Sequence, residues 1–384
     1  MSVSFIFLCI SLFTWGLGEG LFFVFQPIYL AQLGANTMTI ATVYAAFGAA
    51  MMAAHIPAGY LADRLGRKPL LLAAWTSGLI ATWVMALART LPVFIVGMLL
   101  YGLTAFVSSP LNSYVTVERG KLSPARAMTL ASAAFNMGTV IGPLTGGWIG
   151  DRIGLRTVYS IAAGLFIVSI CFLFFIKSQS RDHHDPDVPT PSLLKNPRFV
   201  GLLGLIFVVM FTTFLPQPLT ARFLENERHL SLQSIGLLGS INGLGNAAFN
   251  LFFGQFSSLL GLLLVQFCVM AFSLLIWRGT NLGWYAVGYF VLGGYRTARA
   301  FVFSTVRSLI HPAQMGLAYG VAETFNSLAV VLAPLLAGVL YTSKPELVYS
   351  TSLVLIGLAI LLTIVFMPRQ AADPATRVKP STEP

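Results

Sequence analysis

The chain has 384 residues, of which 56% are hydrophobic and only 9% are charged, and its mean hydropathy is +0.80. Soluble domains carry about 25% charged residues, so this composition excludes an ordinary soluble protein. The net charge of +10 could suggest a nucleic-acid partner, but the basic residues cluster between apolar runs, which indicates membrane topology and excludes nucleic acid.

Twelve apolar segments recur along the chain, and each is long enough to cross a bilayer. The strand alternation of a membrane barrel is absent, so we predict an all-α membrane protein with twelve transmembrane helices. We expect the first segment to be a helix that is retained, because no basic region precedes it. The segments cover residues 4–31, 38–61, 69–88, 92–116, 127–150, 157–177, 199–221, 232–255, 259–278, 282–307, 314–342 and 346–367.

The loops between these segments differ in charge. If the N-terminus is cytoplasmic, 14 of the Lys and Arg residues lie on the cytoplasmic side and 7 on the outer side. Cytoplasmic loops carry the excess of basic residues. We therefore expect a multi-pass protein of the cytoplasmic (inner) cell membrane with both termini cytoplasmic and with the lipid bilayer as partner.

One long polar connection divides the chain. It is rich in Pro and Asp and reads as a flexible linker. We predict an N-terminal six-helix bundle over 1–177, a cytoplasmic linker over 178–198, a C-terminal six-helix bundle over 199–367 and a cytoplasmic tail over 368–384.

The two halves repeat each other weakly. Gln26-Pro27 returns as Gln217-Pro218, 191 positions later, and Gly142-Pro143 corresponds to Ala333-Pro334 at the same offset. A shared offset is difficult to obtain by chance. Parallel repeats with the substrate between them are typical of secondary transporters, so the two bundles should be pseudo-symmetric.

A cluster of charged residues lies between two apolar segments, in the sequence Gly59-Tyr60-Leu61-Ala62-Asp63-Arg64-Leu65-Gly66-Arg67-Lys68. The spacing resembles the loop between helices 2 and 3 of the major facilitator superfamily of secondary transporters. The resemblance implies a loop that locks one access state, with its acid near the start of helix 11. Its base would pair with an acid at the end of helix 4. The expected gating residues are Gly59, Asp63, Arg64, Gly66, Arg67, Lys68 and Glu118, the last as partner of Arg67.

The fifth predicted helix carries closely spaced glycines around a proline. Glycines four residues apart allow tight contact between helices, and the proline should bend the helix. The pattern is similar to a signature of the 12-helix drug:proton antiporter branch, which implies export. The helix-packing residues are Gly138, Gly142, Pro143, Gly146 and Gly147, and we expect Gly239 and Gly243 of the eighth helix to face them.

The fourth helix departs from that branch. Its members place an arginine four residues before the glycine equivalent to Gly102, and this chain has Met98 there. Any proton chemistry must then lie elsewhere. The resemblance implies that helices 1, 4, 7 and 10 line the cavity, and Glu19 lies near the middle of helix 1. We predict that Glu19 couples transport to protons, with Glu323 as its rival; a purely structural carboxylate is the alternative.

Charged residues inside the membrane are costly and tend to be functional. We predict a structural Arg299–Glu323 pair, which leaves Arg296 to face Glu19 or an anionic cargo. A polar stripe that includes Asn242 and Asn246 could bind substrate or hold helices together. The candidate substrate-binding residues are Trp15, Gln26, Asn112, Gln217, Asn242, Asn246 and Arg296.

Together these features predict a monomeric secondary transporter that works by alternating access. The favoured cargo is an amphipathic or drug-like small molecule, exported at the expense of a proton gradient and without a cofactor or metal. A transporter of sugars, organic anions or lipid-linked groups is the alternative. A static channel or receptor would not need the repeat or the 59–68 loop, and the motifs of an enzyme are missing.

Overall fold

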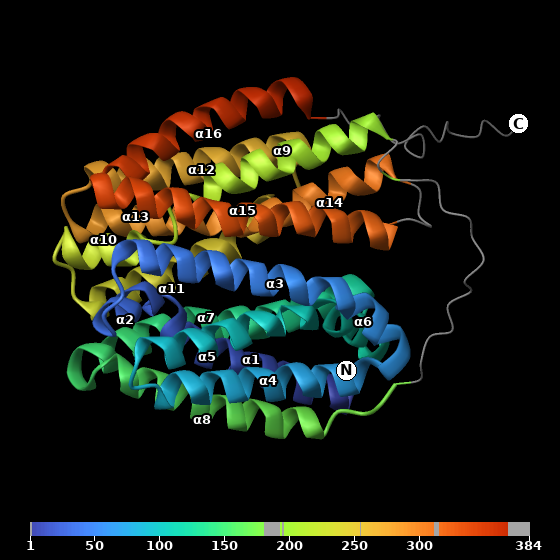
Figure 1. Ribbon diagram of the computed structural model, residues 1–384. Helices are drawn as coiled ribbons and strands as arrows, with labels where there is room; N and C mark the ends of the chain where they lie inside the picture. Colours follow the sequence, from blue (N-terminus) through green and yellow to red (C-terminus); the bar gives the residue numbers. More distant parts are fainter. Residues whose placement is uncertain (1, 180–192, 194–195, 254, 311–314, 368–384) are drawn as a thin grey trace, which may run out of the picture.

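The computed structural model describes residues 2–179, 193, 196–253, 255–310 and 315–367; for 55–65, 108–109, 124–125 and 315–317 it describes the backbone without the side chains. Within these ranges every long regular element is an α-helix (Figure 1). Local signals start several of them: α9 begins at Pro197 behind Asn196, whose side chain accepts hydrogen bonds from the backbone N–H groups of Arg198 and Phe199. Such caps satisfy amides that have no partner within the helix.

The helices follow one another in two sets. The first set is α1 (Val3–Phe23), α2 (Gln26–Gln32), α3 (Thr37–Leu65), α4 (Arg67–Leu87), α5 (Leu91–Leu103), η1 (Thr104–Val107), α6 (Ser108–Glu118), α7 (Pro124–Ile153) and α8 (Leu155–Phe174). The second set is α9 (Pro197–Phe214), α10 (Thr220–Asn226), α11 (Leu232–Phe253), α12 (Ser258–Arg278), α13 (Leu282–Leu292), η3 (Gly293–Thr297), α14 (Ala298–Leu309), α15 (Met315–Ser343) and α16 (Leu347–Phe366).

All twelve predicted segments are helical, but four of them are broken into shorter pieces: α1 and α2, α5 to α6, α9 and α10, and α13 to α14. By length and hydropathy, nine helices of the described part could cross a membrane, or ten if the bent pair 91–107 and 110–118 counts as one span. The all-α membrane fold is confirmed. The count of twelve is not matched. The breaks leave α5, α6, α13 and α14 too short to span alone, and α11 is long enough but is not among the apolar spans.

Tight glycine contacts join α7 to α1. A Cβ added at Gly138 would lie 2.3 Å from the backbone nitrogen of Leu17, and one at Gly146 would lie 2.1 Å from the carbonyl oxygen of Leu21. These two glycines therefore pack against helix 1, and so does Gly142. The sequence predicted that these glycines contact the eighth predicted helix, which is α11. In the structure α11 lies against another face of α7.

The face of α7 that meets α11 carries Pro143 and Gly147. A Cβ at Gly236 would lie 2.2 Å from the carbonyl oxygen of Pro143, and one at Gly239 would lie 2.9 Å from the Pro143 ring. Gly243 lies against the side chain of Val140. The glycine stripe expected on the eighth predicted helix, which is α11, thus does face α7, but it meets Pro143 and Val140 there.

The two sets of helices form two bundles that lie side by side, with α3 and α11 at the boundary (Figure 1). Two pairs cross that boundary, α7 with α11 and α3 with α15, and α2 also touches α10. The crossing contacts include Gly147 with Leu232 and Gly338 with Ala41. These residues lie near the ends of α7 and α15, so the bundles are closely packed at the end of the molecule opposite to the start of α1.

Candidate functional site

A cavity of about 570 Å³ lies between the two bundles. Its wall is largely aromatic and apolar, and most of it comes from the first bundle. The second bundle adds Arg299 of α14 and four residues of α15. Besides aromatic residues, the polar or charged residues in the lining are Glu19, Thr104, Asn112, Ser132, Arg299, Glu323, Asn326 and Ser327, and the larger aromatic ones are Trp15, Trp75, Tyr101, Phe23, Phe47 and Phe135.

Glu19 stands in this wall on α1 and is partly buried. The hydroxyl of Tyr101, on α5, donates a hydrogen bond of 2.7 Å to its Oε2. Next to it, Trp15 stacks on Phe166 with ring centroids 4.0 Å apart and planes 4° apart. Trp15 also lies nearly parallel to Tyr101. A carboxylate is therefore fixed beside a rigid aromatic surface, an arrangement that can offer both a charge and a stacking face.

Arg299 and Glu323 form the predicted ion pair. Nε of Arg299 lies 2.5 Å from Oε1 of Glu323, and the Nδ2 group of Asn326 donates to the other carboxylate oxygen at 3.3 Å. The exposed fractions of the two side chains are 53% and 13%. Glu323 is thus largely enclosed by its partners, whereas the Arg299 guanidinium keeps a face toward the cavity.

Arg296 lies on η3, one helical turn before Arg299, and its side chain is exposed. It is close enough to Glu19 for their opposite charges to attract through space. Arg296 is absent from the described lining of the cavity. It therefore acts on Glu19 from a distance, whereas Tyr101 acts by direct contact.

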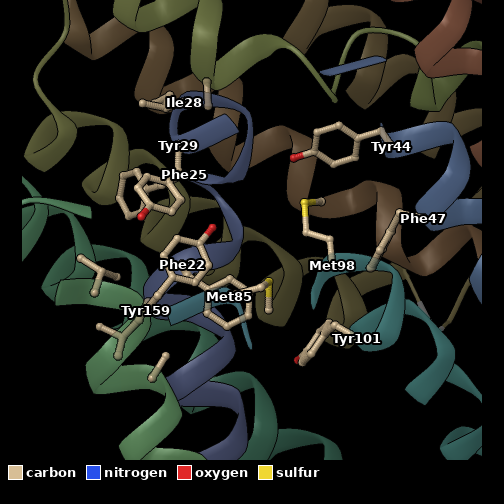
Figure 2. Close-up of a cluster of buried hydrophobic side chains, with 14 of the residues drawn as sticks. Phe22, Phe25, Ile28, Tyr29, Tyr44, Phe47, Met85, Met98, Tyr101 and Tyr159 are labelled. Carbon is tan, nitrogen blue, oxygen red and sulfur yellow. The ribbon is translucent and has the colours of Figure 1, made fainter. Parts of the chain in front are cut away.

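Met98 occupies the place of the antiporter arginine and is fully buried. Figure 2 shows its side chain between Tyr44 and Tyr101, close to Phe47. This apolar cluster is a poor environment for a charge, since a buried cation without a paired acid is strongly unfavourable. The local packing accounts for a methionine at this position.

The other candidate binding residues are placed outside the cavity. Gln26 is fully buried, and its amide atoms have no hydrogen-bond partner among the described residues. Gln217 donates to the carbonyl oxygen of Thr213 at 2.8 Å. Asn242 donates to the carbonyl oxygen of Tyr289, and Asn246 contacts Asn136 at 3.5 Å. In this conformation the asparagines link helices. Only Trp15 and Asn112 of the candidate binding set line the cavity.

The side chains of Gly59, Asp63 and Arg64 lie outside the described residues. Gly66 separates α3 from α4 with a φ of +84°, which favours glycine. Lys68 donates to the carbonyl oxygens of Phe174 and Ile176. The loop therefore rests on the end of α8.

The predicted pair of Arg67 and Glu118 is not among the ion pairs of the described residues. Nη1 of Arg67 donates to Gln179 at 2.9 Å, and Glu118 accepts a hydrogen bond from the Ser2 hydroxyl at 3.1 Å. Gln179 belongs to the segment after α8, which the sequence treated as the beginning of a linker. A pairing rule taken from helix order could not identify that residue.

Two further residues were missed. Tyr101 is the direct partner of Glu19, and its place three residues after Met98 on the expected cavity helix could have indicated it. Asp151, at the end of α7, accepts hydrogen bonds from the second bundle. Its sequence context, Asp151-Arg152-Ile153-Gly154, repeats the spacing of Asp63-Arg64-Leu65-Gly66. No group of three or more potential metal ligands occurs in the described part of the chain.

Relatives of the chain are multidrug resistance proteins. "Multidrug resistance protein 2" of Bacillus subtilis is 23% identical over 365 residues, which cover 88% of each chain. "Multidrug resistance protein MdtG" of Salmonella paratyphi A is 27% identical over 250 residues, covering 60% of this chain and 61% of the relative. "Multi-drug resistance efflux pump PmrA" of Streptococcus pneumoniae is 28% identical, and the match spans about half the length of both proteins, 52% and 51%.

Solved transporters share the fold. A point mutant of the nucleoside transporter NupG has a TM-score of 0.80 at 15% identity, over 95% of this chain and 99% of that one. A bacterial homologue of the lysosomal transporter Spinster, in an inward-facing and occupied conformation, has a TM-score of 0.74 at 14% identity, over 94% and 96%. The family model of the Major Facilitator Superfamily matches residues 8–311 and 202–382. With this match across nearly the whole chain, the protein belongs to the major facilitator superfamily of transporters.

Proposed function

We propose that this transporter exports amphipathic, drug-like small molecules in exchange for protons. The observation that carries the proposal is the cavity between the bundles, where the Glu19 carboxylate stands beside the stacked rings of Trp15 and Tyr101. Aromatic walls accept apolar bodies of varied shape. The names of the relatives support efflux as the direction.

Glu19 is the proposed coupling group. It lines the cavity, and its carboxylate accepts a hydrogen bond from the Tyr101 hydroxyl. Glu323, by contrast, is held by Arg299 and Asn326. A carboxylate engaged by a guanidinium is less free to exchange a proton than one bonded to a neutral phenol. This difference favours Glu19 over Glu323, and a proton gradient would then be the energy source without any cofactor.

The conformation is proposed to be inward-facing. The bundles are closed at the end where α7 meets the start of α11, and the cavity lies toward the end where α1 begins. With both termini cytoplasmic, as the distribution of Lys and Arg favours, the cavity faces the cytoplasm. We propose a monomer in the cytoplasmic membrane, since both bundles that form the cavity come from one chain.

A second candidate cargo is an organic anion. Arg299 exposes half of its side chain and lines the cavity, and Arg296 lies on the same short stretch. A guanidinium binds carboxylate and phosphate groups well. Among the structural neighbours, NupG is described as a nucleoside transporter, which keeps metabolite transport open for this fold.

Transport into proteoliposomes distinguishes these possibilities. Purified protein is reconstituted, a pH gradient is imposed, and uptake of a lipophilic cationic dye, an organic anion and a neutral sugar is measured. Export by proton exchange predicts accumulation of the dye that stops when an ionophore collapses the gradient. Accumulation of the anion alone would support the second cargo. Equal uptake with and without the gradient would reject proton coupling.

A further inference from the structure

Asp151 connects the two bundles at their closed end. It lies in the last turn of α7, and its two carboxylate oxygens accept hydrogen bonds from the first two backbone amides of α11. Oδ1 accepts from Leu232 at 2.9 Å, and Oδ2 accepts from Gln233 at 2.8 Å. A carboxylate of the first bundle therefore caps a helix of the second.

The start of α11 depends on this contact. The first amides of a helix lack partners within the helix, and the helix dipole favours a negative charge near them. Ser231 provides one local cap, since its hydroxyl oxygen accepts from the backbone N–H of Ser234 at 3.1 Å. Asp151 satisfies the amides of Leu232 and Gln233. If the bundles separated here, these two amides would have to form hydrogen bonds with water instead.

The close approach of the backbones brings Asp151 to this position. A Cβ at Gly147 would lie 2.4 Å from the carbonyl oxygen of Leu232. One turn earlier, the Ser240 hydroxyl of α11 accepts the backbone N–H of Leu144 at 3.0 Å, where Pro143 interrupts the regular bonding of α7. The contact along α7 and α11 is thus continuous and ends at the carboxylate.

Two contacts between the bundles, α7 with α11 and α3 with α15, form seams, and the helix that starts at the second seam is capped differently. The start of α3, which packs against α15, uses its own Asn36, whose Oδ1 accepts the backbone N–H of Thr39 at 2.8 Å. Thr342, which corresponds to Asp151 at the repeat offset of 191, donates to Gly338 within its own helix. Among the described residues, the carboxylate cap between bundles therefore belongs to the α7–α11 seam.

Resting on the transport function proposed above, we propose that Asp151 is a gating residue that holds the closed end shut by capping α11 across the bundle boundary. Opening that end breaks two hydrogen bonds and a favourable charge–dipole contact, and closing it restores them. Asp151 shifts the equilibrium between the two access states without contacting the cargo. Its loss should favour the state that is open at the α7–α11 end.

The test measures exposure of the seam directly. In a background in which Cys9, Cys171 and Cys268 are replaced by alanine, Ser240→Cys reports on the closed end, because Ser240 is buried against α7. Ser132→Cys reports on the cavity, where residue 132 is exposed. Maleimide labelling rates of both reporters are compared with and without Asp151→Ala, in protein reconstituted in lipid nanodiscs.

We expect Asp151→Ala to raise the labelling rate of Ser240→Cys by roughly three- to thirtyfold, the equilibrium factor that corresponds to the loss of a helix cap. Labelling of Ser132→Cys should fall. Asp151→Asn, which keeps one acceptor oxygen, should have an intermediate effect. The matched control is Asn281→Ala, because Asn281 caps α13 by accepting the N–H of Trp284 within its own bundle.

The gate is rejected if Asp151→Ala leaves both rates unchanged, or if Asn281→Ala raises the Ser240→Cys rate equally, since the effect would then be a general loss of stability. The labelling rate needs no cargo, so it separates the two proposals. A rise in labelling with no transport of any tested compound would reject the efflux function and keep the gate. Proton-driven export of a tested compound together with unchanged labelling would support the efflux function and reject the gate.

Discussion

Tyr101 and Glu19 form a 2.7 Å hydrogen bond that joins α5 to α1 in the wall of the cavity. Because a phenol can donate to a carboxylate and can also bond to a protonated carboxyl, the contact persists in either charge state of Glu19. The acid is therefore held in position while its charge changes. This property suits a group that alternates between proton and cargo.

Glu19→Gln should abolish proton-driven accumulation and leave exchange of cargo across the membrane partly intact. Glutamine keeps the size of the side chain and an oxygen that can accept from Tyr101, but it cannot carry the charge. The measurement compares gradient-driven uptake with cargo counterflow in proteoliposomes, across a range of external pH.

Glu323→Gln is the control for that experiment, because Glu323 is already paired with Arg299. It should reduce stability or rate without removing the dependence on the gradient. If Glu19→Gln transports at the original rate with unchanged pH dependence, Glu19 is a structural carboxylate and the coupling assignment is wrong.

Periodic and compositional features were predictable from the sequence. Apolar length placed the helical segments, because the bilayer imposes a minimum length on any span. The cost of isolated charge in the membrane led to the Arg299–Glu323 pair, since each residue had few possible partners.

Contacts set by three-dimensional packing were not predictable. The glycines of α7 were recognised, but one stripe cannot tell whether α1 or α11 lies on it, and the structure uses both sides. Gln179 carries no charge and lies beyond the last helix of its bundle, so nothing in the sequence distinguished it as the partner of Arg67. Tyr101 is also uncharged, and only its place on the expected cavity helix could have indicated it as the partner of Glu19. The asparagines of α11 lie on a polar stripe whose direction depends on helix rotation, and Asn242 bonds to α13 outside the cavity.

Arg299 and Glu323 should be coupled in their effect on stability. Replacing either alone, by Arg299→Gln or Glu323→Gln, leaves a charge in the bundle without its partner, whereas the double replacement removes both. Because half of the Arg299 side chain is exposed, we expect a coupling energy of only about 0.5–1 kcal/mol. Thermal unfolding of the four proteins in detergent gives this value. Purely additive effects would show that the pair contributes nothing to the fold.

Gly236→Ala should destabilise the contact between the bundles. The added methyl group would lie 2.2 Å from the carbonyl oxygen of Pro143, so α11 and α7 would have to separate. Overpacking of this kind costs about 1–3 kcal/mol, and the melting temperature in detergent should fall by several degrees. Gly164→Ala on α8 is the matched control, because an added Cβ there has no neighbour within 4 Å. A loss of similar size in both variants would show that helix flexibility, not contact, is responsible.

Orientation in the membrane is testable with impermeant thiol reagents in intact cells that express cysteine variants. Arg89→Cys and Lys344→Cys should be labelled, since both residues are exposed and lie at the end of the molecule where the bundles are closed. Lys121→Cys, exposed in the loop between α6 and α7 at the other end, should be labelled only after the cells are permeabilised. The expectation follows from the excess of basic residues at that end, which resists translocation. Labelling of Lys121→Cys in intact cells would show that the protein is inserted in the opposite orientation. The cavity that contains Glu19 would then face the outside in this conformation.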